Sequence, residues 1–421
     1  MPRCGGPDHA WLFDVLVGTD SAVWAPAGQL PAGYELAEQI AVLPASRGRS
    51  FMVSLGSRRG AASALTSYNR LRGRRTRAVR RVIGLGLRTG LAPYVLANKI
   101  DIGVRADAAA GPDDALLTGY LCTLFGRGPV VVAFGAGSGP YRKPVLQVFD
   151  ADGTPLGYVK VGWNDWTRQA VRREAAALRA CTRSGARLGV PGLLDHARWR
   201  GLELLVTAPL PLGVRRMPMG SGLPDASILH EISALSAPYT GELLSSPWWL
   251  ALQRRIGSCA GQPGSGARLL ALADQIERTW GATVLRFGAW HGDFVPWNLA
   301  WHGDRLYAWD WESSDLTAPA GFDALHFHFQ VAFVGRRRPL AEAAAIAEQK
   351  AAAALAGLGV PAAGHHLHAV LHLTELLVRH EEARVSTGDA DDRFFPRIIS
   401  VLENSLRCSR GPGLPAVERS S

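Results

Sequence analysis

The chain has 421 residues, 47% of them hydrophobic, so it can form two or three domains with cores of their own. The net charge is +10, and residues 1–130 hold 16 basic and 9 acidic residues, but nearly all the basic ones are arginines and their excess is weak evidence of function. The cysteines are scattered without a C-x-x-C pair, which argues against a structural zinc site or a disulfide framework and favours a reducing cytoplasm; they are Cys4, Cys122, Cys181, Cys259 and Cys408.

The N-terminal segment is a poor signal peptide. It has one early arginine and a short apolar run, 10–18, which Asp14 interrupts. No uncharged apolar run of about 18 residues follows it. We therefore expect a cytoplasmic protein without a transmembrane segment, while peripheral contact with a membrane stays open.

Residues 1–114 are expected to form a basic N-terminal extension of unclear fold, with strands at Ala37–Val42 and Ser50–Leu55, a helical stretch from about 61 to 96 and a linker at 106–113. The helical stretch carries a run of arginines: Arg70, Arg72, Arg74, Arg75, Arg77, Arg80 and Arg81. We interpret the run as a solvated helix face, with a docking surface for an anionic substrate, a membrane or a nucleic acid as the alternative. Only Tyr68 interleaves with the arginines, which disfavours a nucleic-acid groove.

From residue 115 the expected elements are a helix at 115–124, a strand at 130–134 and a hairpin of strands at 144–149 and 156–161. Between the first strand and the hairpin lie Gly135, Gly137 and Gly139. The backbone N–H groups of such a turn can approach phosphates closely, although a flexible turn has the same pattern.

The next helix, expected at 165–182, has an apolar face with Glu174 in its middle. A carboxylate on a buried face needs a cation, and Lys160 in the second hairpin strand is the candidate. The alternative is a Glu174 that reaches solvent. A strand at 202–206 then leads into a loop that begins with Thr207 and Ala208.

The stretch 290–312 concentrates the residue types that carry out catalysis and bind metal ions. His291-Gly292-Asp293 follows an apolar segment, and Asn298 stands five residues after Asp293. Two short strands, 298–301 and 305–309, are expected to form a hairpin that brings Asp310 beside Asn298. Its turn repeats the Trp-His-Gly-Asp tetrapeptide at 301–304, but no amide follows five residues later, so we interpret the second copy as a turn only.

The pattern H-G-D-x-x-x-x-N, followed by D-W-E at 310–312, resembles the catalytic and metal loops of the aminoglycoside phosphotransferase and choline kinase group. The resemblance runs in order over residues 115–410 and implies an α+β, two-lobed protein-kinase-like fold, with a β-rich N-lobe at 115–210 and a helical C-lobe at 211–410. It implies transfer of the γ-phosphoryl group of ATP or GTP to a hydroxyl group, with magnesium as a cofactor.

The same resemblance implies a role for each matched residue. Asp293 would orient and deprotonate the acceptor hydroxyl, Lys160 would neutralise the phosphates, and Glu174 would aim Lys160. Asn298 and Asp310 would bind magnesium, and Glu312 would add an oxygen ligand or hold the loop. The remaining assignments are phosphate contact by Gly135, Gly137 and Gly139, base contact by Thr207 and Ala208, and support of the catalytic loop by Asp323, which would accept backbone N–H bonds.

Two departures from protein kinases bear on the substrate. Gly292 stands where protein kinases have the arginine that meets a phosphorylated activation loop, and only residues 313–321 separate Glu312 from the next apolar segment. This leaves no room for a platform that docks a peptide, so we expect a small-molecule acceptor. The glycine spacing, G-x-G-x-G, also differs from the G-x-G-x-x-G of protein kinases.

The C-terminal part is expected to be helical, with helices at 228–235, 248–256, 266–279, 340–358, 366–384 and 393–408 and a disordered tail from 411. Several histidines lie near or in the fifth of these helices: His365, His366, His368, His372 and His380. They lack the H-E-x-x-H arrangement, so we expect core or helix-surface histidines and not a zinc site.

Two other functions stay open. The altered glycine turn is compatible with a pseudokinase that binds a nucleotide without turnover. The arginine run is compatible with a protein that binds an anionic surface or a nucleic acid through residues 1–114. The identity of the acceptor, the choice between ATP and GTP and the oligomeric state do not follow from the sequence.

Overall fold

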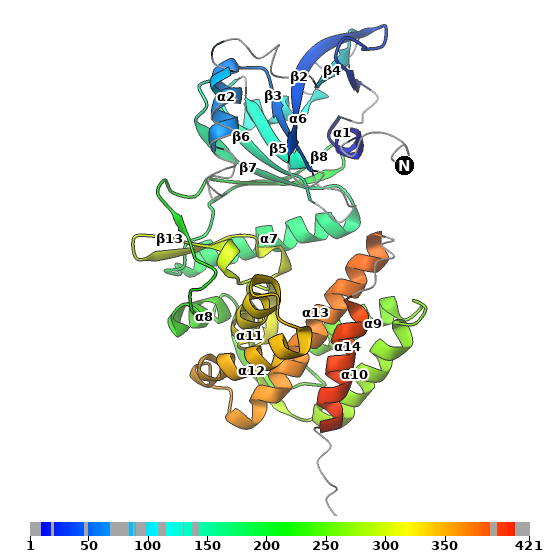
Figure 1. Cartoon of the computed structure of the whole chain (residues 1–421), viewed down its shortest axis with the longest axis vertical. Coiled ribbons are helices and arrows are strands. Elements are labelled where there is room, and N and C mark those ends of the chain that lie inside the picture. Colours follow the sequence, from blue (N-terminus) through cyan, green and yellow to red (C-terminus); the bar gives the residue numbers. More distant parts are fainter. Residues whose placement is uncertain are drawn as a thin grey trace, which may run out of the picture. The chain divides into compact units, whose positions relative to one another are not determined.

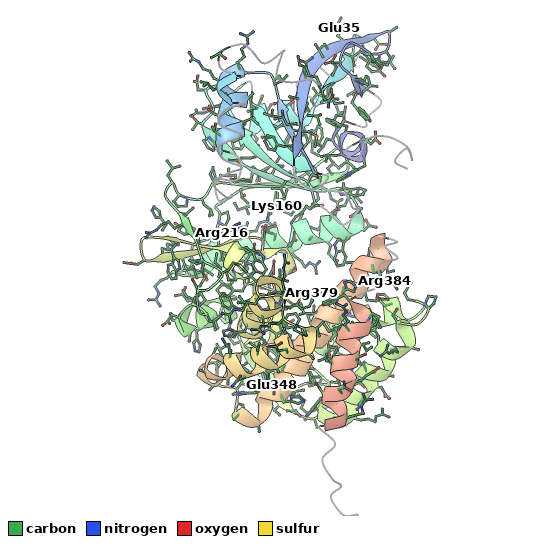
Figure 2. The ribbon with its side chains drawn as sticks, viewed as in Figure 1. Glu35, Lys160, Arg216, Glu348, Arg379 and Arg384 are labelled. Atoms are coloured by element: carbon green, nitrogen blue, oxygen red, sulfur yellow. The ribbon has the colours of Figure 1, made fainter. Side chains whose placement is uncertain are left out.

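The computed structural model describes residues 10–17, 21–45, 49–67, 84–86, 89, 98–107, 115–128, 130–136, 143–387 and 394–408 (Figures 1 and 2). The chain divides into two compact units, 1–175 with 191–212 and 176–190 with 213–421. We call them the N-terminal unit and the C-terminal unit. The first is built on a sheet and the second is mainly helical, which confirms the expected α+β class.

The N-terminal unit contains a nine-stranded sheet whose neighbours all pair antiparallel, in the order β1-β4-β2-β3-β5-β6-β7-β9-β8. Its strands are β1 (Ala22–Pro26), β2 (Tyr34–Ala45), β3 (Arg49–Ser54), β4 (Lys99–Arg105), β5 (Val131–Ala136), β6 (Val145–Phe149), β7 (Pro155–Gly162), β8 (Leu193–Trp199) and β9 (Leu202–Thr207). Because β3 pairs with β5, strands from residues 1–114 and from residues 115–210 lie in one sheet. The domain limits expected at 114, 210 and 410 stay predictions.

Apolar clusters cover both faces of the sheet at β2, β3, β5 and β6. Successive residues of a strand point to opposite faces, and in β5 Val132 and Phe134 belong to one apolar cluster while Val131 and Ala133 belong to another. The first cluster includes residues of helices α1 (Ala10–Val17) and α6 (Leu117–Phe125), and the second includes residues of α2 (Arg58–Ser67). The strands around Lys160 are therefore held in a packed core.

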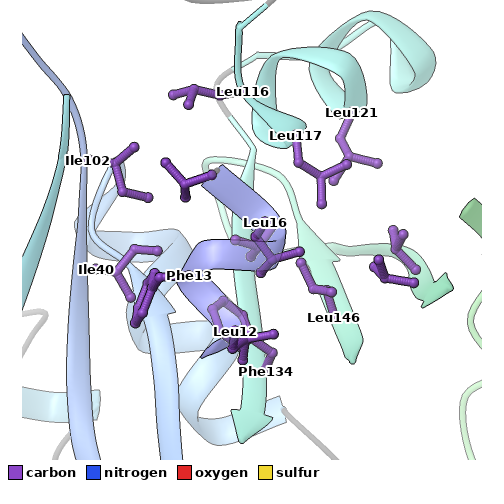
Figure 3. Packing of buried hydrophobic residues seen from close by; sticks show 14 of the residues in the cluster. Leu12, Phe13, Leu16, Ile40, Ile102, Leu116, Leu117, Leu121, Phe134 and Leu146 are labelled. Atoms are coloured by element: carbon purple, nitrogen blue, oxygen red, sulfur yellow. The ribbon is translucent and has the colours of Figure 1, made fainter. Parts of the chain in front are cut away.

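Helix α1 accounts for the apolar run near the N-terminus. Its Leu12, Phe13 and Leu16 are buried and pack with Ile40 and Phe134 of the sheet, as Figure 3 shows. Full burial of such a side chain contributes about 1.5–3 kcal/mol relative to exposure. The run that makes a poor signal peptide is thus a core helix of the N-terminal unit.

The C-terminal unit consists of helices and two small sheets. Its helices are α8 (Ala226–Ser233), α9 (Pro247–Cys259), α10 (Gly266–Trp280), α11 (Phe322–Gln330), α12 (Leu340–Gly357), α13 (His365–Thr387) and α14 (Phe395–Cys408). One three-stranded sheet holds β10 (Arg215–Arg216), β13 (Leu299–His302) and β14 (Arg305–Ala308), and the other holds β11 (Tyr239–Glu242), β12 (Val284–Trp290) and β15 (Asp315–Pro319). Figure 1 shows α10, α13 and α14 packed side by side.

Most of the expected elements are present. The structure confirms the strands expected near 37–42 and 50–55, which are β2 and β3, and the strands on either side of the glycines, which are β5, β6 and β7. It also confirms the hairpin after Asn298 and the six C-terminal helices α8, α9, α10, α12, α13 and α14. A helix that begins near Asp323 was expected, and α11 is that helix. The elements that were not expected are helix α1 and strands β1, β4, β8, β10, β11, β12 and β15. The predictions for the arginine run Arg70–Arg81, for residues 108–113 of the linker, for Gly137 and Gly139 and for the tail from 411 lie outside the described residues.

Local sequence explains where two of these helices begin. The side chain of Asp225 accepts a hydrogen bond from the backbone N–H of Ser227 at the start of α8, and the hydroxyl of Ser246 accepts one from Trp249 N–H at the start of α9. Pro247 occupies the first turn of α9, where its missing N–H costs nothing. Among the described residues, no helix has the length and apolar character to cross a membrane.

Candidate active site

In the N-terminal unit, Lys160 and Glu174 form the predicted ion pair. Lys160 Nζ lies 2.5 Å from Glu174 Oε1, and both side chains are buried (Figure 2 labels Lys160). Glu174 comes from α7 (Asp165–Ser184) and Lys160 from β7, so the pair fastens the helix to the sheet. A buried carboxylate without a cation would be costly, which explains why the apolar face of α7 can hold one.

A second lysine, Lys143, also contacts Glu174. Its Nζ lies 3.4 Å from Glu174 Oε2, and its side chain is buried. Two ammonium groups therefore flank one carboxylate. Lys143 was not predicted from the sequence, although the rarity of lysine was a signal, since the chain has only four lysines.

Two other predicted nucleotide-binding residues of this unit, Gly135 and Thr207, lie in strands, and Ala208 directly follows one. Gly135 is within β5, opposite Phe51 of β3. Thr207 is the last residue of β9 and is paired on both sides, with Tyr158 and Leu193. The backbone N–H of Ala208 donates to Gly192 O at 2.7 Å, so this group already has a partner. The contacts of these residues with a nucleotide stay predictions.

In the C-terminal unit, the loop predicted to be catalytic, 291–298, begins where β12 ends; we call it the catalytic loop. Gly292 has φ +82°, and a Cβ atom at this position would lie 2.0 Å from Ser313 O. Only glycine fits such a backbone conformation and such a close approach. This explains why the sequence has Gly292 where protein kinases have an arginine.

Asp323 supports this loop from the first turn of α11. Its carboxylate accepts the backbone N–H groups of His291 and Gly292, at 2.8 and 3.1 Å. Burial raises the pKa of Asp323 to about 6, and the two N–H bonds oppose that rise. The supporting contact that the resemblance implied is confirmed.

His291 is buried and links the catalytic loop to the segment before Asp310. Its Nδ1 accepts the backbone N–H of Asp293 at 3.2 Å, and its Nε2 lies 3.1 Å from the carbonyl oxygen of Trp309. A backbone N–H can only donate and a carbonyl can only accept, so the ring is neutral with its proton on Nε2. Burial lowers the pKa of His291 to about 4, in agreement with a neutral ring.

Both carboxylate oxygens of Asp293 are held. Asn298 Nδ2 donates to Asp293 Oδ2 at 2.8 Å and to Asp293 O at 3.1 Å. His326 Nε2 lies 3.0 Å from Asp293 Oδ1. Since Asn298 uses its amide nitrogen on Asp293, its amide oxygen is the atom available to a cation.

The hairpin predicted after Asn298 is present. Leu299 pairs with Ala308 and His302 with Arg305, and Trp309 N donates to Asn298 O at 3.2 Å. Asp310, the next residue, has φ +65°, which is uncommon outside glycine and is found at functional sites. The chain then turns through Trp311–Ser313, which contains Glu312. The expected position of Asp310 beside the Asn298 strand follows from this pairing.

Arg379 of α13 joins the two loops (Figure 2). Its guanidinium donates to Gly292 O at 3.2 Å and to Ser313 O at 2.7 Å, and it lies over the ring of Trp290. Glu375, one turn before it in α13, accepts its Nε–H at 2.6 Å. Arg379 was not predicted from the sequence, because its partners lie 66 and 87 residues away.

The donor atoms fit magnesium. This ion takes oxygen ligands and commonly uses one or two carboxylates together with water and phosphate oxygens. Among the described residues, no group of three or more His, Cys, Asp or Glu side chains could hold a metal by itself. The amide oxygen of Asn298 and the carboxylates of Asp310 and Glu312 offer only oxygen ligands. They contain two carboxylates, the number that magnesium commonly uses together with water and phosphate oxygens.

A scan against protein-family models finds no match, and a search of curated proteins finds no relative. Among solved structures, the chain is similar to a thermostable mutant of aminoglycoside phosphotransferase APH(4)-Ia, with 13% identity, 70% of this chain and 100% of that chain covered, and a TM-score of 0.49. A further structure of that mutant, carrying one more substitution, is a ternary complex with ADP and hygromycin B.

A choline kinase and a choline/ethanolamine kinase family protein are also similar to this chain. The choline kinase of Streptococcus pneumoniae has 14% identity, with 65% of this chain and 92% of that chain covered and a TM-score of 0.42. A choline/ethanolamine kinase family protein from Mesorhizobium loti has 14% identity, with 64% and 89% covered and a TM-score of 0.39. These structures belong to the group that the motif at 290–312 resembles.

Proposed function

We propose that this protein is a magnesium-dependent phosphotransferase that moves the γ-phosphoryl group of ATP or GTP to a hydroxyl group of a small molecule. The observation that carries the proposal is the Asp293–Asn298 pair. The Asn298 amide nitrogen fixes the Asp293 carboxylate, and the Asn298 amide oxygen is left for a cation. The Asp323 carboxylate holds the backbone N–H groups of the same loop. Phosphoryl transfer depends mainly on such positioning and on charge stabilisation.

Each residue then has a defined task. The acceptor hydroxyl gives its proton to the Asp293 carboxylate as its oxygen forms a bond to the γ-phosphorus. The bond from that phosphorus to the β–γ bridging oxygen breaks, and the nucleoside diphosphate leaves. Lys160, aimed by Glu174, neutralises phosphate charge. Asn298, Asp310 and Glu312 would hold magnesium, which when bound would supply positive charge to offset the negative charge that develops on the phosphates.

The small size of the acceptor is part of the proposal. The segment after Glu312 enters β15 within three residues, and β15 pairs with β12. Helix α11 begins three residues after β15. A chain this short and this regular has no long segment on which a peptide could dock, and this supports a small hydroxyl compound.

The proposal can be tested by the same substitution in the two copies of the Trp-His-Gly-Asp tetrapeptide, at 290–293 and 301–304. Asp293→Asn keeps the shape of the side chain but removes proton acceptance, so turnover is expected to fall about 10²–10⁴-fold. Asp304→Asn makes the same change in the exposed second copy and should leave turnover unchanged. The measurement is nucleoside diphosphate release with ATP or GTP over a panel of aminoglycosides, amino alcohols and sugars.

Binding of the magnesium nucleotide, measured by calorimetry, provides a readout that needs no acceptor. Wild-type protein and Asp293→Asn should bind equally, whereas Asp310→Asn should bind more weakly. Equal turnover in Asp293→Asn and wild type, or nucleotide binding that ignores magnesium, would contradict the proposal.

A further inference from the structure

The buried His326 has no task in the proposed reaction, yet it contacts Asp293, the proposed general base. His326 Nε2 lies 3.0 Å from Asp293 Oδ1. The imidazole is almost fully buried, whereas the Asp293 side chain is 36% exposed. The histidine therefore approaches the carboxylate from the protein interior and leaves its outer side to solvent or an acceptor.

The same helical turn supplies both supports of the catalytic loop. Asp323 and His326 are three residues apart in α11, so their side chains lie on one face of the helix. Asp323 holds the backbone of His291 and Gly292, and His326 holds the side chain of the next residue, Asp293. One element thus fixes the loop and the orientation of its carboxylate together.

A second buried histidine stands behind the first. His326 Nδ1 lies 3.3 Å from His372 Nε2 of α13, and both rings pack against Trp290. Burial holds the pKa of His372 well below its usual range, so His372 is neutral. The Nδ1 of His326 either accepts a hydrogen bond from His372 or donates one to it. Because the carboxylate oxygen of Asp293 can only accept, the Nε2 of His326 carries a proton in both arrangements and donates it to Asp293.

We propose that His326 is a positioning residue that, together with Asn298, fixes the Asp293 carboxylate in one orientation for the acceptor, while His372 holds the other ring nitrogen of His326. This rests on the phosphotransferase function proposed above. One bond to each carboxylate oxygen stops rotation of the group, and each oxygen keeps a lone pair for the acceptor hydroxyl. The effect belongs to the chemical step, because His326 itself does not face the acceptor.

The kinetic test uses three variants of α11. His326→Phe keeps a ring and removes the donor; kcat is expected to fall up to about 10²-fold while KM for nucleotide and acceptor stays within about twofold, as for a mispositioned group. His326→Gln places an amide N–H near the position of Nε2 and should recover most of kcat. His328→Phe makes the ring change two residues away, where the histidine packs on Phe327, and should match wild type.

Two kinetic outcomes would overturn the proposal. One is an unchanged kcat in a folded His326→Phe. The other is an equal loss of kcat in the Phe and Gln variants with unchanged melting temperatures, since a role in packing alone would not distinguish a donor from a matched ring.

A measurement that needs no turnover separates this proposal from the proposed function. In protein labelled with ¹⁵N-histidine, the Nε2–H of His326 should give a slowly exchanging, downfield proton resonance that His326→Gln removes and that Asp293→Ala shifts. Absence of that resonance, or its persistence without a shift in Asp293→Ala, would sink the inference even if the enzyme is active. Its presence in a protein that transfers no phosphoryl group would reject the proposed function and leave the contact standing.

Discussion

The chain carries the tetrapeptide Trp-His-Gly-Asp twice, and the two copies differ in almost every structural respect. The first copy, 290–293, has a buried tryptophan and histidine, and its glycine has no room for a Cβ atom. The second copy, 301–304, ends β13 and forms a hairpin turn with an exposed histidine and aspartate and open space around Gly303. The tetrapeptide alone therefore predicts nothing. The difference comes from Asn298, Asp323 and Arg379, which hold the first copy and have no counterpart in the turn of the second.

The largest difference is expected at the glycines. Alanine at either position must adopt a left-handed backbone, which costs about 1–2 kcal/mol. At Gly292 it must also displace Ser313 O, whereas nothing lies within 4 Å at Gly303. Gly292→Ala should abolish turnover and lower the melting temperature clearly, and Gly303→Ala should reduce stability only slightly. Thermal melts and turnover of both variants check this, and similar behaviour of the pair would mean that the close approach to Ser313 is relieved without cost.

The next difference concerns the support from α11. Asp323→Asn leaves one acceptor oxygen for two backbone N–H groups, so one buried donor loses its partner, at a cost of about 1–3 kcal/mol. Chemical denaturation should show that loss, together with a fall in kcat. Asp304→Asn, in the exposed turn, is the matched control and should change neither. If Asp323→Asn were as stable as wild type, the support of His291 and Gly292 by this carboxylate would be energetically unimportant.

The smallest expected difference is in the pH dependence of stability. The pKa of His291 is lowered from 6.5 to about 4 by burial. Between these values the unfolded chain binds a proton that the folded chain does not, so stability is lost as the pH falls from 6.5 toward 4. His291→Gln should make this loss smaller, and His302→Gln in the second copy should not change it. The slope of the unfolding free energy against pH is the measurement.

That slope should decrease without vanishing in His291→Gln, because burial also lowers the pKa values of His328 and His368 to about 4. A slope identical to that of wild type would show that His291 is not buried as a neutral ring. A slope that changes equally in His302→Gln would remove the contrast between the two copies.

How far the sequence predicts the site depends on how local each contact is. The Lys160–Glu174 pair was predicted from the apolar face of a helix, and the position of Asp310 from a four-residue hairpin strand and its turn. Arg379 and His326 were not predicted, because they reach the catalytic loop only through the packing of α13 and α11. Neither residue has a local pattern that distinguishes it from other arginines and histidines of those helices.

The fold, like the site, was predicted where it depends on local sequence and was missed where it depends on contacts between distant residues. The strands at 37–42 and 50–55 were predicted as two strands around a polar turn; β2 contains the first, and β3 covers the second as far as Ser54. That β3 pairs with β5, and so continues the sheet that carries Lys160, depends on contacts about 80 residues apart in the chain. Helix α1 was missed because its eight residues are too few to show a helical period, and it gains its stability from packing on Ile40 and Phe134.

The guanidinium of Arg379 has a consequence for motion. It holds Gly292 O in the catalytic loop and Ser313 O in the loop after Asp310, and Glu375 holds it in turn. If one loop opens, its hydrogen bond to the Arg379 guanidinium must break. Because the same guanidinium holds the other loop, we expect that loop to be released as well. In native-state hydrogen exchange, the amides of His291, Gly292 and Ser314 should therefore open as one cooperative unit with a single opening free energy. Whatever ligand orders one of these loops would slow exchange in both.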